Sequence, residues 1–470
     1  MNCTVTVLSG AVPVYKKREI QMLNKIKLRW SNFIENVQAG DKKARMWLII
    51  YVGVILFAAV LVVGVIRLNS GYNTYEVLDI IDKNDDVSVN YHVVGDGLIR
   101  YSKDGASYSD KKGKTLWNQT FEMANAKIAS CDKFMAIADI GSNQLRIFNQ
   151  AGQVAVIEAT YPIANVDVSE QGVTAVILSA SDASYINMYD TKGNKLVDIK
   201  VSISQTGYPM DFAISDDGTK LAVSYMVVND GEISSKIAFY KFGKATPSAD
   251  SNAVDEFSID MIVPKMDFIN NNTLVAFGDS GFKIYSMKDT PKELLDKSFE
   301  QEIKSVFYNE QYIGFVFKNN AGGQMNETDA LSDTVASDVA VSDTSAADLA
   351  ADGAHLIVEE AGETAGTSQS QSVSQPSGDT ETVMPYKMQI YTNGGALYLE
   401  QDFDFEYHNI DCTENEIVMY NDYECLMMTY QGKEKFRYTF ENKIYNLMPK
   451  KTKDEYILVD ETAIQEIKLK

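Results

Sequence analysis

The residues that most often perform catalysis or bind metals are few and scattered in this sequence. Histidine occurs three times and cysteine four times among 470 residues. No His-x-x-x-His pair, Cys-x-x-Cys pair or mixed Cys/His cluster occurs, so no metal-ligand set has the usual spacing. We therefore assign no catalytic, cofactor-binding or metal-binding residue and leave the binding residues unassigned. The residues concerned are His92, His355, His408, Cys3, Cys131, Cys412 and Cys425.

Other catalytic motifs are also missing from the sequence. There is no Gly-x-Ser-x-Gly nucleophile elbow and no phosphate-binding loop. The motif Asp216-Asp217-Gly218 lacks the alternating acidic pattern of a calcium loop and predicts a turn. Because the chain has 65 Asp and Glu residues, a pair of carboxylates in the sequence does not indicate a glycosidase, which needs two of them at a fixed distance. Cys131, Cys412 and Cys425 form an odd set and are predicted to be free, mostly buried thiols.

The charge of the chain is unevenly distributed. The net charge is -22, which argues against a nucleic-acid partner because phosphate binding needs a basic surface. Residues 1–45 nevertheless carry nine Lys and Arg against three Asp and Glu, and the 21 residues of 46–66 carry no charge. A helix of that length, rising about 1.5 Å per residue, would span the roughly 30 Å core of a bilayer.

We predict that 46–67 is an uncleaved transmembrane signal anchor and that the lipid bilayer is its partner. Lys and Arg stay on the cytoplasmic side, so 1–45 would be a cytoplasmic head, 68–74 a short linker and 75–470 extracytoplasmic. A cleaved signal peptide and a buried helix are alternative interpretations of the anchor.

The cytoplasmic head carries one periodic segment. Apolar residues in 19–37 recur at steps of three and four, which predicts an amphipathic helix on the membrane or on a partner. A basic flank that only orients the anchor is the simpler alternative. Met1 and Met22 both fit as the first residue.

The rest of the chain repeats one short unit. The stretch "YSDKKGKTLWN" (108–118) reads as a strand, a Lys-Gly turn and a second strand. Similar hairpins begin at residues 146, 186, 283, 388 and 426. A second hairpin precedes each one, most clearly "DFAISDDGTKLAVSY" (211–225). Turn residues between alternating apolar strands predict hairpins, and four strands recurring about every 40 residues are the signature of a β-propeller blade.

The predicted fold is therefore an all-β, eight-bladed propeller, with seven blades as the alternative. Seven complete blades are predicted over 87–121, 126–160, 165–201, 209–261, 265–299, 303–404 and 408–441. The last stretch, 444–470, supplies only three strands, and "YEVLDII" (75–81) is left over. We predict that 75–81 completes the eighth blade as its outermost strand, which removes an open edge and fixes both ends of the domain.

An acidic insertion interrupts the sixth blade between its second and third strands. Residues 321–385 contain twelve Asp and Glu and no Lys or Arg. Such a segment cannot bury enough apolar surface to offset its ordering entropy, so we predict that it is disordered. It is either an acidic arm at the ligand-binding face or a tolerated insertion. A longer loop is also predicted over 226–236 in blade four.

Two of these repeats resemble known propellers. The stretch 108–118 resembles the repeat of quinoprotein-type propellers, and 211–225 is similar to WD40-like and TolB-like repeats. The whole layout is similar to uncharacterised membrane-anchored propeller proteins of Gram-positive anaerobes. This resemblance implies a fold and a place at the cell surface, not an activity. Only the first unit ends in a tryptophan, Trp117, and no cofactor is predicted.

These observations favour a non-catalytic module that binds a protein or another ligand, or acts as a scaffold in the cell envelope. A protein or cell-envelope partner is expected at the propeller face. The alternative is a cell-surface enzyme that acts on glycans or small substrates at the channel face. Converging carboxylates there would favour the enzyme, whereas an aromatic-rich rim would favour binding, because tyrosine is enriched at interfaces.

Overall fold

The computed structural model describes residues 71–83, 89–229, 231–243, 253–319 and 384–470, and scattered residues between 31 and 57. The chain divides into two units, Met1–Gly71 and Tyr72–Lys470. The predictions for 1–45, 19–37, 46–67 and 321–385 fall largely outside the described residues. Among the residues that are described, no helix has the length and apolar character needed to cross a membrane.

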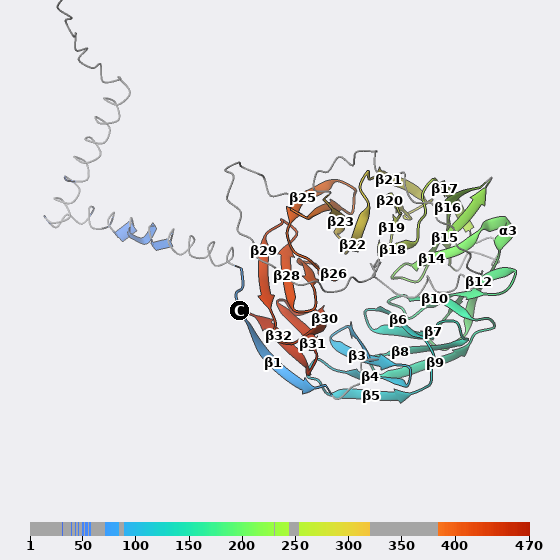
Figure 1. Cartoon of the computed structure of the whole chain (residues 1–470), viewed down its shortest axis with the longest axis horizontal. Helices are drawn as coiled ribbons and strands as arrows, with labels where there is room; N and C mark the ends of the chain where they lie inside the picture. The colour runs from blue at the N-terminus through green and yellow to red at the C-terminus, as the bar shows by residue number, and fades with distance from the viewer. Residues whose placement is uncertain are drawn as a thin grey trace, which may run out of the picture. The chain divides into compact units, whose positions relative to one another are not determined.

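The second unit, Tyr72–Lys470, is built from eight antiparallel four-stranded sheets. Figure 1 shows them as blades around one axis, with the first strand of each blade innermost. Blade 1 is β2 (Asn90–Val94), β3 (Gly97–Ser102), β4 (Gly105–Ser109) and β5 (Thr115–Thr120); blade 2 is β6 (Ala126–Cys131), β7 (Phe134–Asp139), β8 (Gln144–Asn149) and β9 (Gly152–Glu158); blade 3 is β10 (Ile163–Val168), β11 (Thr174–Ser179), β12 (Ala183–Tyr189) and β13 (Lys195–Ser202). The single-turn helix α3 (Ile203–Thr206) follows blade 3.

The next four blades keep the same order of strands. Blade 4 is β14 (Tyr208–Ile214), β15 (Lys220–Asn229), β16 (Glu232–Lys241) and β17 (Ala253–Ile259); blade 5 is β18 (Lys265–Asn270), β19 (Thr273–Phe277), β20 (Gly281–Ser286) and β21 (Lys292–Ser298). Blade 6 is β22 (Ile303–Tyr308), β23 (Tyr312–Lys318), β24 (Tyr386–Thr392) and β25 (Leu397–Phe403); blade 7 is β26 (Asn409–Cys412), β27 (Glu416–Tyr420), β28 (Glu424–Thr429) and β29 (Glu434–Thr439).

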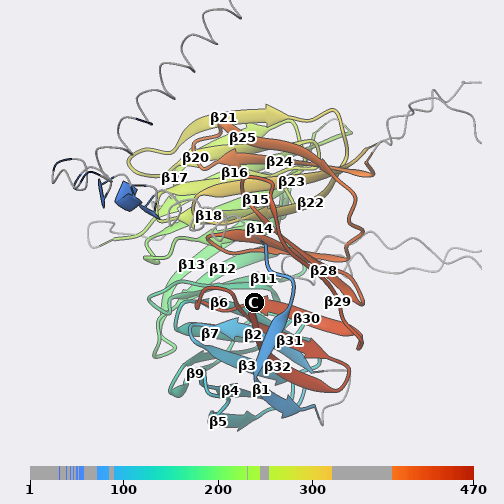
Figure 2. The same ribbon diagram turned by 90° about the vertical axis from the view of Figure 1, so that its left-hand side faces the viewer.

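The eighth blade joins the two ends of the propeller. It contains β30 (Ile444–Pro449), β31 (Glu455–Asp460) and β32 (Ala463–Leu469), and its outermost strand is β1 (Tyr75–Asp82). Figure 2 shows β1, in blue, beside β32, in red, with which it pairs antiparallel from Tyr75↔Leu469 to Asp82↔Ala463. The predicted eight blades and the predicted closing strand are confirmed, and the seven-bladed alternative is wrong.

Repeated turns explain why the hairpins form where the sequence predicts them. In the turn after β4, the Asp110 carboxylate accepts hydrogen bonds from the backbone N–H groups of Lys112 and Lys114, at 2.9 and 3.0 Å. Gly113 has φ of 73°, a left-handed conformation that glycine adopts without a steric penalty. The turn after β12 repeats this arrangement with Asp190 and Gly193, so the Asp-x-x-Gly spacing is the local signal for this hairpin.

An apolar cluster fills each of the eight contacts between neighbouring blades. Between blades 1 and 2, Trp117 stacks on Phe148 with ring centroids 4.9 Å apart, so Trp117 packs between the two sheets. The cluster between blades 8 and 1 has only four buried members, whereas every other cluster has at least nine. The contact that closes the ring is therefore the least filled.

Blade 4 differs from its prediction, while blade 6 agrees with it. The predicted loop over 226–236 is wrong, because β15 and β16 stay paired until Asn229↔Glu232. The segment is rich in β-branched residues, which favour strands, and Gly231 in the turn has φ of 88°. In blade 6, β23 ends at Lys318 and β24 begins at Tyr386, so the insertion does join the second and third strands.

Close packing inside blade 6 gives a first testable prediction. Phe307 of β22 lies opposite Gly314 of β23, and a Cβ atom on Gly314 would lie 2.0 Å from the Phe307 ring. Gly314→Ala should therefore lower the free energy of unfolding by about 1–3 kcal/mol through overpacking. The matched control is Gly394→Ala in the same blade, where the nearest atom would be 3.8 Å away. Urea unfolding of both variants measures the difference, and equal stabilities would contradict this account of the packing.

Candidate functional site

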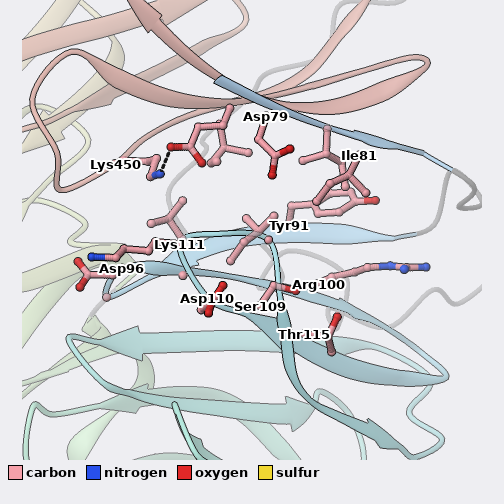
Figure 3. A pocket seen from close by; sticks show the side chains of 18 of the residues that line it. Asp79, Ile81, Tyr91, Asp96, Arg100, Ser109, Asp110, Lys111, Thr115 and Lys450 are labelled. Atoms are coloured by element: carbon pink, nitrogen blue, oxygen red, sulfur yellow. Dashed lines mark hydrogen bonds and ion pairs between the residues drawn. The ribbon is translucent and has the colours of Figure 1, made fainter. Parts of the chain in front are cut away.

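The weakly filled contact between blades 8 and 1 contains a cavity of about 230 Å³, which we call the seam pocket. Figure 3 shows it between β1 and the other strands of blade 8 on one side and the first strands of blade 1 on the other. Apolar side chains form much of its wall: Ile81, Tyr91, Val93, Leu98, Ile457 and Ile464. A cavity with such a wall suits the apolar part of a ligand.

A bulge in β1 decides which side chains of that strand face the pocket. Tyr75 packs against Tyr438 of blade 7, with ring centroids 5.1 Å apart. Regular alternation would place Asp79 and Ile81 on that same face. The pairing shifts between Val77 and Asp79, so Asp79 and Ile81 turn to the opposite face and line the pocket. Opposite them, blade 1 contributes small residues such as Gly97 and Ser107, and the space between the sheets stays open.

Charged turns border the seam pocket. Lys450 is nearly buried and forms ion pairs with Glu466 and, at 4.0 Å, with Glu455. Lys451 forms a 2.8 Å ion pair with Asp132 of blade 2. Lys111 lines the other side, in the turn after β4, and is exposed. The pocket thus combines an apolar interior with charges at its border, which is the pattern of a site for a ligand with one polar end.

The chain enters the propeller next to one of these turns. The Tyr72 N–H donates to the Lys435 carbonyl oxygen at 2.6 Å, and the Tyr72 hydroxyl donates to Asp454 at 2.8 Å. Burial and the hydrogen bond to Asp454 raise the pKa of Tyr72 to about 12. The Asp454 carboxylate also forms an ion pair with the Lys435 ammonium group at 2.6 Å. The turn after β30 is therefore fixed to the start of the propeller.

A second polar group, which we call the inner-strand cluster, comes from the first strands of blades 3 to 6. Asn165 of β10 donates to Asp211 of β14 at 2.9 Å. Lys265 of β18 lies 3.9 Å from the same Asp211 carboxylate. The Tyr308 hydroxyl of β22 donates to Asp267 at 2.6 Å. Asp167 accepts hydrogen bonds from two backbone N–H groups, at 2.8 and 3.1 Å.

The electrostatics of this cluster favour neutral carboxyl groups. Burial, together with the negative charge of Asp267, raises the pKa of Asp167 to about 7. Burial also raises the pKa of Asp211, and it raises that of Asp216, in the turn after β14, to about 6. The Asp211 carboxylate, together with Tyr308, holds the pKa of Lys265 well above its usual value. The cluster therefore pairs the Lys265 cation with Asp211, while the Asp167 carboxyl group titrates near neutral pH.

The structure does not bring His92 and His408 together. His92 of β2 is within hydrogen-bond distance of the Ser130 hydroxyl, at 2.9 Å, and burial lowers its pKa. His408, before blade 7, lies 3.5 Å from an Asp422 oxygen. His355 lies outside the described residues.

The cysteines of the propeller are free thiols, as predicted. Cys425 is buried, while Cys131 and Cys412 are half-buried. Burial raises the pKa of Cys412 and Cys425 to about 12. Because the thiolate is the reactive form, both side chains are protonated at neutral pH and act as small apolar groups rather than nucleophiles.

The motif Asp216-Asp217-Gly218 forms the predicted turn, between β14 and β15. Gly218 has φ of 67°. Although burial opposes ionisation, hydrogen bonds from Thr219 and Ser215 lower the pKa of Asp217 to about 2. The Asp217 carboxylate therefore stabilises the turn through these hydrogen bonds.

Sequence reasoning missed the seam pocket, although one signal was available. The turns 110–114 and 450–454 each contain three lysines in a strongly acidic chain. The first of them belongs to the stretch 108–118, which we interpreted only as a structural repeat. Ser109, Asp110 and Thr115 of that stretch line the pocket, so the repeat has a second role.

The chain matches the model of a family of unknown function (DUF5711) over residues 68–352 and 366–469. It therefore belongs to that family, and its fold is an eight-bladed β-propeller. BamB from Moraxella catarrhalis is similar over 84% of this chain and 100% of that one, with 11% identity and a TM-score of 0.45. The Neurospora crassa Pan2 WD40 domain is similar over 73% of this chain and 88% of that one, with 9% identity and a TM-score of 0.37. No curated protein matches the chain.

Proposed function

We propose that this protein is a membrane-anchored, extracytoplasmic β-propeller of a Gram-positive cell envelope, and that it acts as a non-catalytic binding module. The uncharged segment 46–66 and the basic residues before it support the anchor and its orientation. The seam pocket is the observation that carries the binding function. Its partner is a protein segment or another envelope ligand with an apolar part and a polar end.

The seam pocket supports binding because two of its charged groups, Lys450 and Asp110, are already held by structural contacts. Lys450 is paired with Glu466 and Glu455. The Asp110 carboxylate accepts two backbone hydrogen bonds within its own turn. A ligand would therefore meet a preformed wall rather than groups arranged to exchange protons, and preformed walls favour affinity by reducing the ordering cost of association.

The inner-strand cluster is the observation that favours an enzyme as the second candidate. Asp167, with a pKa of about 7, is poised as a general acid would be. Its oxygens, however, accept backbone hydrogen bonds from Val168 and Ile214, which tie it to the sheets. A glycan-hydrolysing activity that disappears in Asp167→Asn, with the fold intact, would favour the enzyme over the binding module.

Site-specific photo-crosslinking in intact cells tests the proposed function. A photoreactive residue in place of Thr115, which lines the seam pocket, should give one discrete adduct. The same residue in place of Lys192, in an exposed turn of blade 3, should give several-fold less. Val93→Trp should abolish the adduct by filling the pocket, because Val93 is part of its wall.

The same cells test the location of the propeller. An amine reagent that does not cross membranes should label Lys192 in intact cells but Lys25 only after lysis. Equal adducts from positions 115 and 192 would contradict the proposed site. Labelling of Lys25 but not Lys192 in intact cells would contradict the proposed orientation.

A further inference from the structure

In each antiparallel blade, the turn between the first and second strands and the turn between the third and fourth strands lie at the same end of the sheet; we call this end of the propeller the rim. In blades 3 and 4, the Glu170 N–H donates to the Asp216 carbonyl oxygen at 3.0 Å. Between blades 4 and 5, the Asp217 N–H donates to Asn271 at 2.7 Å. Between blades 8 and 2, Lys451 pairs with Asp132 at 2.8 Å. These contacts place the turns of blades 3, 4 and 5 side by side, and likewise those of blades 8 and 2, so their charges can be compared on a single surface.

The charge of this rim is polarised. Its turns in blades 3, 4, 6 and 7 contain acidic residues: Glu170, Asp216, Asp217, Glu310 and Glu414. Beside the seam pocket, the turns 110–114 and 450–454 each contain three lysines and one aspartate, so these two turns are basic, whereas the short turn between β2 and β3 contains Asp96. We call the exposed members the lysine rim: Lys111, Lys112, Lys114, Lys451 and Lys453. The net charge of the chain is -22, and we interpret this cluster of exposed lysines as a binding surface for an anionic partner.

The lysine rim lies where the chain enters the propeller. The turn that carries Lys451 and Lys453 also holds Asp454, to which Tyr72 donates a hydrogen bond at 2.8 Å. From Arg67, at the end of the proposed anchor, five peptide steps lead to Tyr72, and they can span at most about 18 Å. On the proposed function, the lysine rim is therefore the part of the propeller that the anchor holds close to the bilayer.

Strand β1 adds an apolar component beside the lysine rim. Val77, Leu78, Ile80 and Ile81 are 43%, 45%, 58% and 42% exposed. None of the outermost strands of the other seven blades exposes more than two large apolar side chains. Basic residues next to exposed apolar ones are typical of surfaces that bind anionic membranes.

We propose that the lysine rim, together with the exposed side of β1, binds the anionic phospholipid headgroups of the membrane that anchors the chain. The inference rests on the proposed anchoring and goes beyond it, because an anchor alone leaves the propeller free to rotate above the bilayer. The lysine ammonium groups bind phosphodiester oxygens as point charges. This contact fixes one side of the propeller against the membrane and leaves the acidic blades away from it.

Lysine footprinting of the full chain in vesicles tests this contact. The chain is reconstituted into phosphatidylcholine vesicles with or without phosphatidylglycerol, treated with an amine reagent that does not cross membranes, and read by mass spectrometry. Labelling of the lysine rim should be about fivefold slower in the anionic vesicles at low salt, and the protection should vanish at 1 M salt, where the Debye length is about 3 Å. Lys192 and Lys297, exposed on blades 3 and 5, should label equally in both.

Charge-matched variants separate the lysine rim from a general charge effect. In the triple variant K111Q/K112Q/K114Q, the protection of Lys451 and Lys453 should fall. In the control K192Q/K288Q/K297Q, which removes three exposed lysines elsewhere, it should persist. Equal labelling of the rim lysines in both kinds of vesicle would overturn the proposal.

Three further outcomes are also decisive. If alkaline carbonate extracts the chain from the vesicles, the proposed anchoring fails, and this inference fails with it. If the chain resists extraction but the rim is labelled equally, only this inference fails. Protection in native membranes without protection in lipid vesicles would assign the rim to a protein partner and overturn the lipid contact.

Discussion

A chain that begins at residue 83 should lose the cooperative unfolding of the propeller, whereas a chain that begins at Tyr72 should keep it. The shorter chain lacks β1, which pairs with β32 from Tyr75↔Leu469 to Asp82↔Ala463. Of the four strands of blade 8, only β1 comes from the other end of the propeller. Its removal therefore opens the ring as well as exposing a strand edge.

The expected loss is large because β1 covers buried apolar groups. Ile467 and Leu469 of β32 are 0% and 3% exposed, and Tyr75 packs on Tyr438 and Phe440. Each fully buried side chain of this size contributes about 1.5–3 kcal/mol. The sum is several kcal/mol, a large fraction of the roughly 5–15 kcal/mol that stabilises a typical domain.

Urea unfolding followed by tryptophan fluorescence measures this effect. In both shortened chains the remaining tryptophan is Trp117, which stacks on Phe148 between blades 1 and 2 and so reports on a neighbouring contact. The control is Ile80→Ser in the chain from Tyr72, which removes an exposed side chain but keeps the strand and should change stability by less than about 0.5 kcal/mol. Equal transition midpoints for the two chains would show that closure contributes little.

The fold could be predicted from sequence because the signals for a blade are local. Turns such as Asp110 to Lys114 fix each hairpin through hydrogen bonds within five residues. The closing strand could be predicted by counting strands, because 75–81 has no partner nearby in the sequence. The exception was 226–236, where Asn, Asp and Gly suggested a long loop although the flanking β-branched residues continue both strands.

The seam pocket could not be predicted, because it depends on a register that the sequence does not show. Without the bulge between Val77 and Asp79, Leu78 and Ile80 would face blade 1 in place of Asp79 and Ile81. The bulge is a property of the paired strands β1 and β32, which lie at opposite ends of the chain. No local motif in 75–82 indicates it.

The inner-strand cluster was unpredictable for a related reason. Asp167 and Asp267 lie in different blades and act on each other only because both are on first strands of the ring. In a chain with 65 acidic residues, nothing marks these two in advance. The burial that raises the pKa of Asp167 is a property of the assembled blades.

Asp167→Asn should flatten the dependence of stability on pH. The pKa of Asp167 is about 7 in the folded protein and about 3.9 in an unfolded chain. The folded state therefore binds the extra proton between pH 4 and pH 7, and the free energy of unfolding falls as pH rises through that range. Three pKa units correspond to a loss of up to about 4 kcal/mol by pH 8. Asparagine cannot ionise, so the variant should lack this part of the loss.

Urea unfolding of the wild-type chain and the variant from pH 4 to pH 8 measures the difference. The free energy of unfolding of the variant should still fall with pH, but with a smaller slope, because Asp216, with a pKa of about 6, titrates in the same range. The Asp217 carboxylate, whose pKa is about 2, changes stability only below about pH 5. Asp104→Asn, at an exposed turn, is the control and should keep the wild-type slope. If Asp167→Asn also keeps it, the Asp167 carboxyl group is ionised in the folded protein, and the argument for a poised acid in the inner-strand cluster fails.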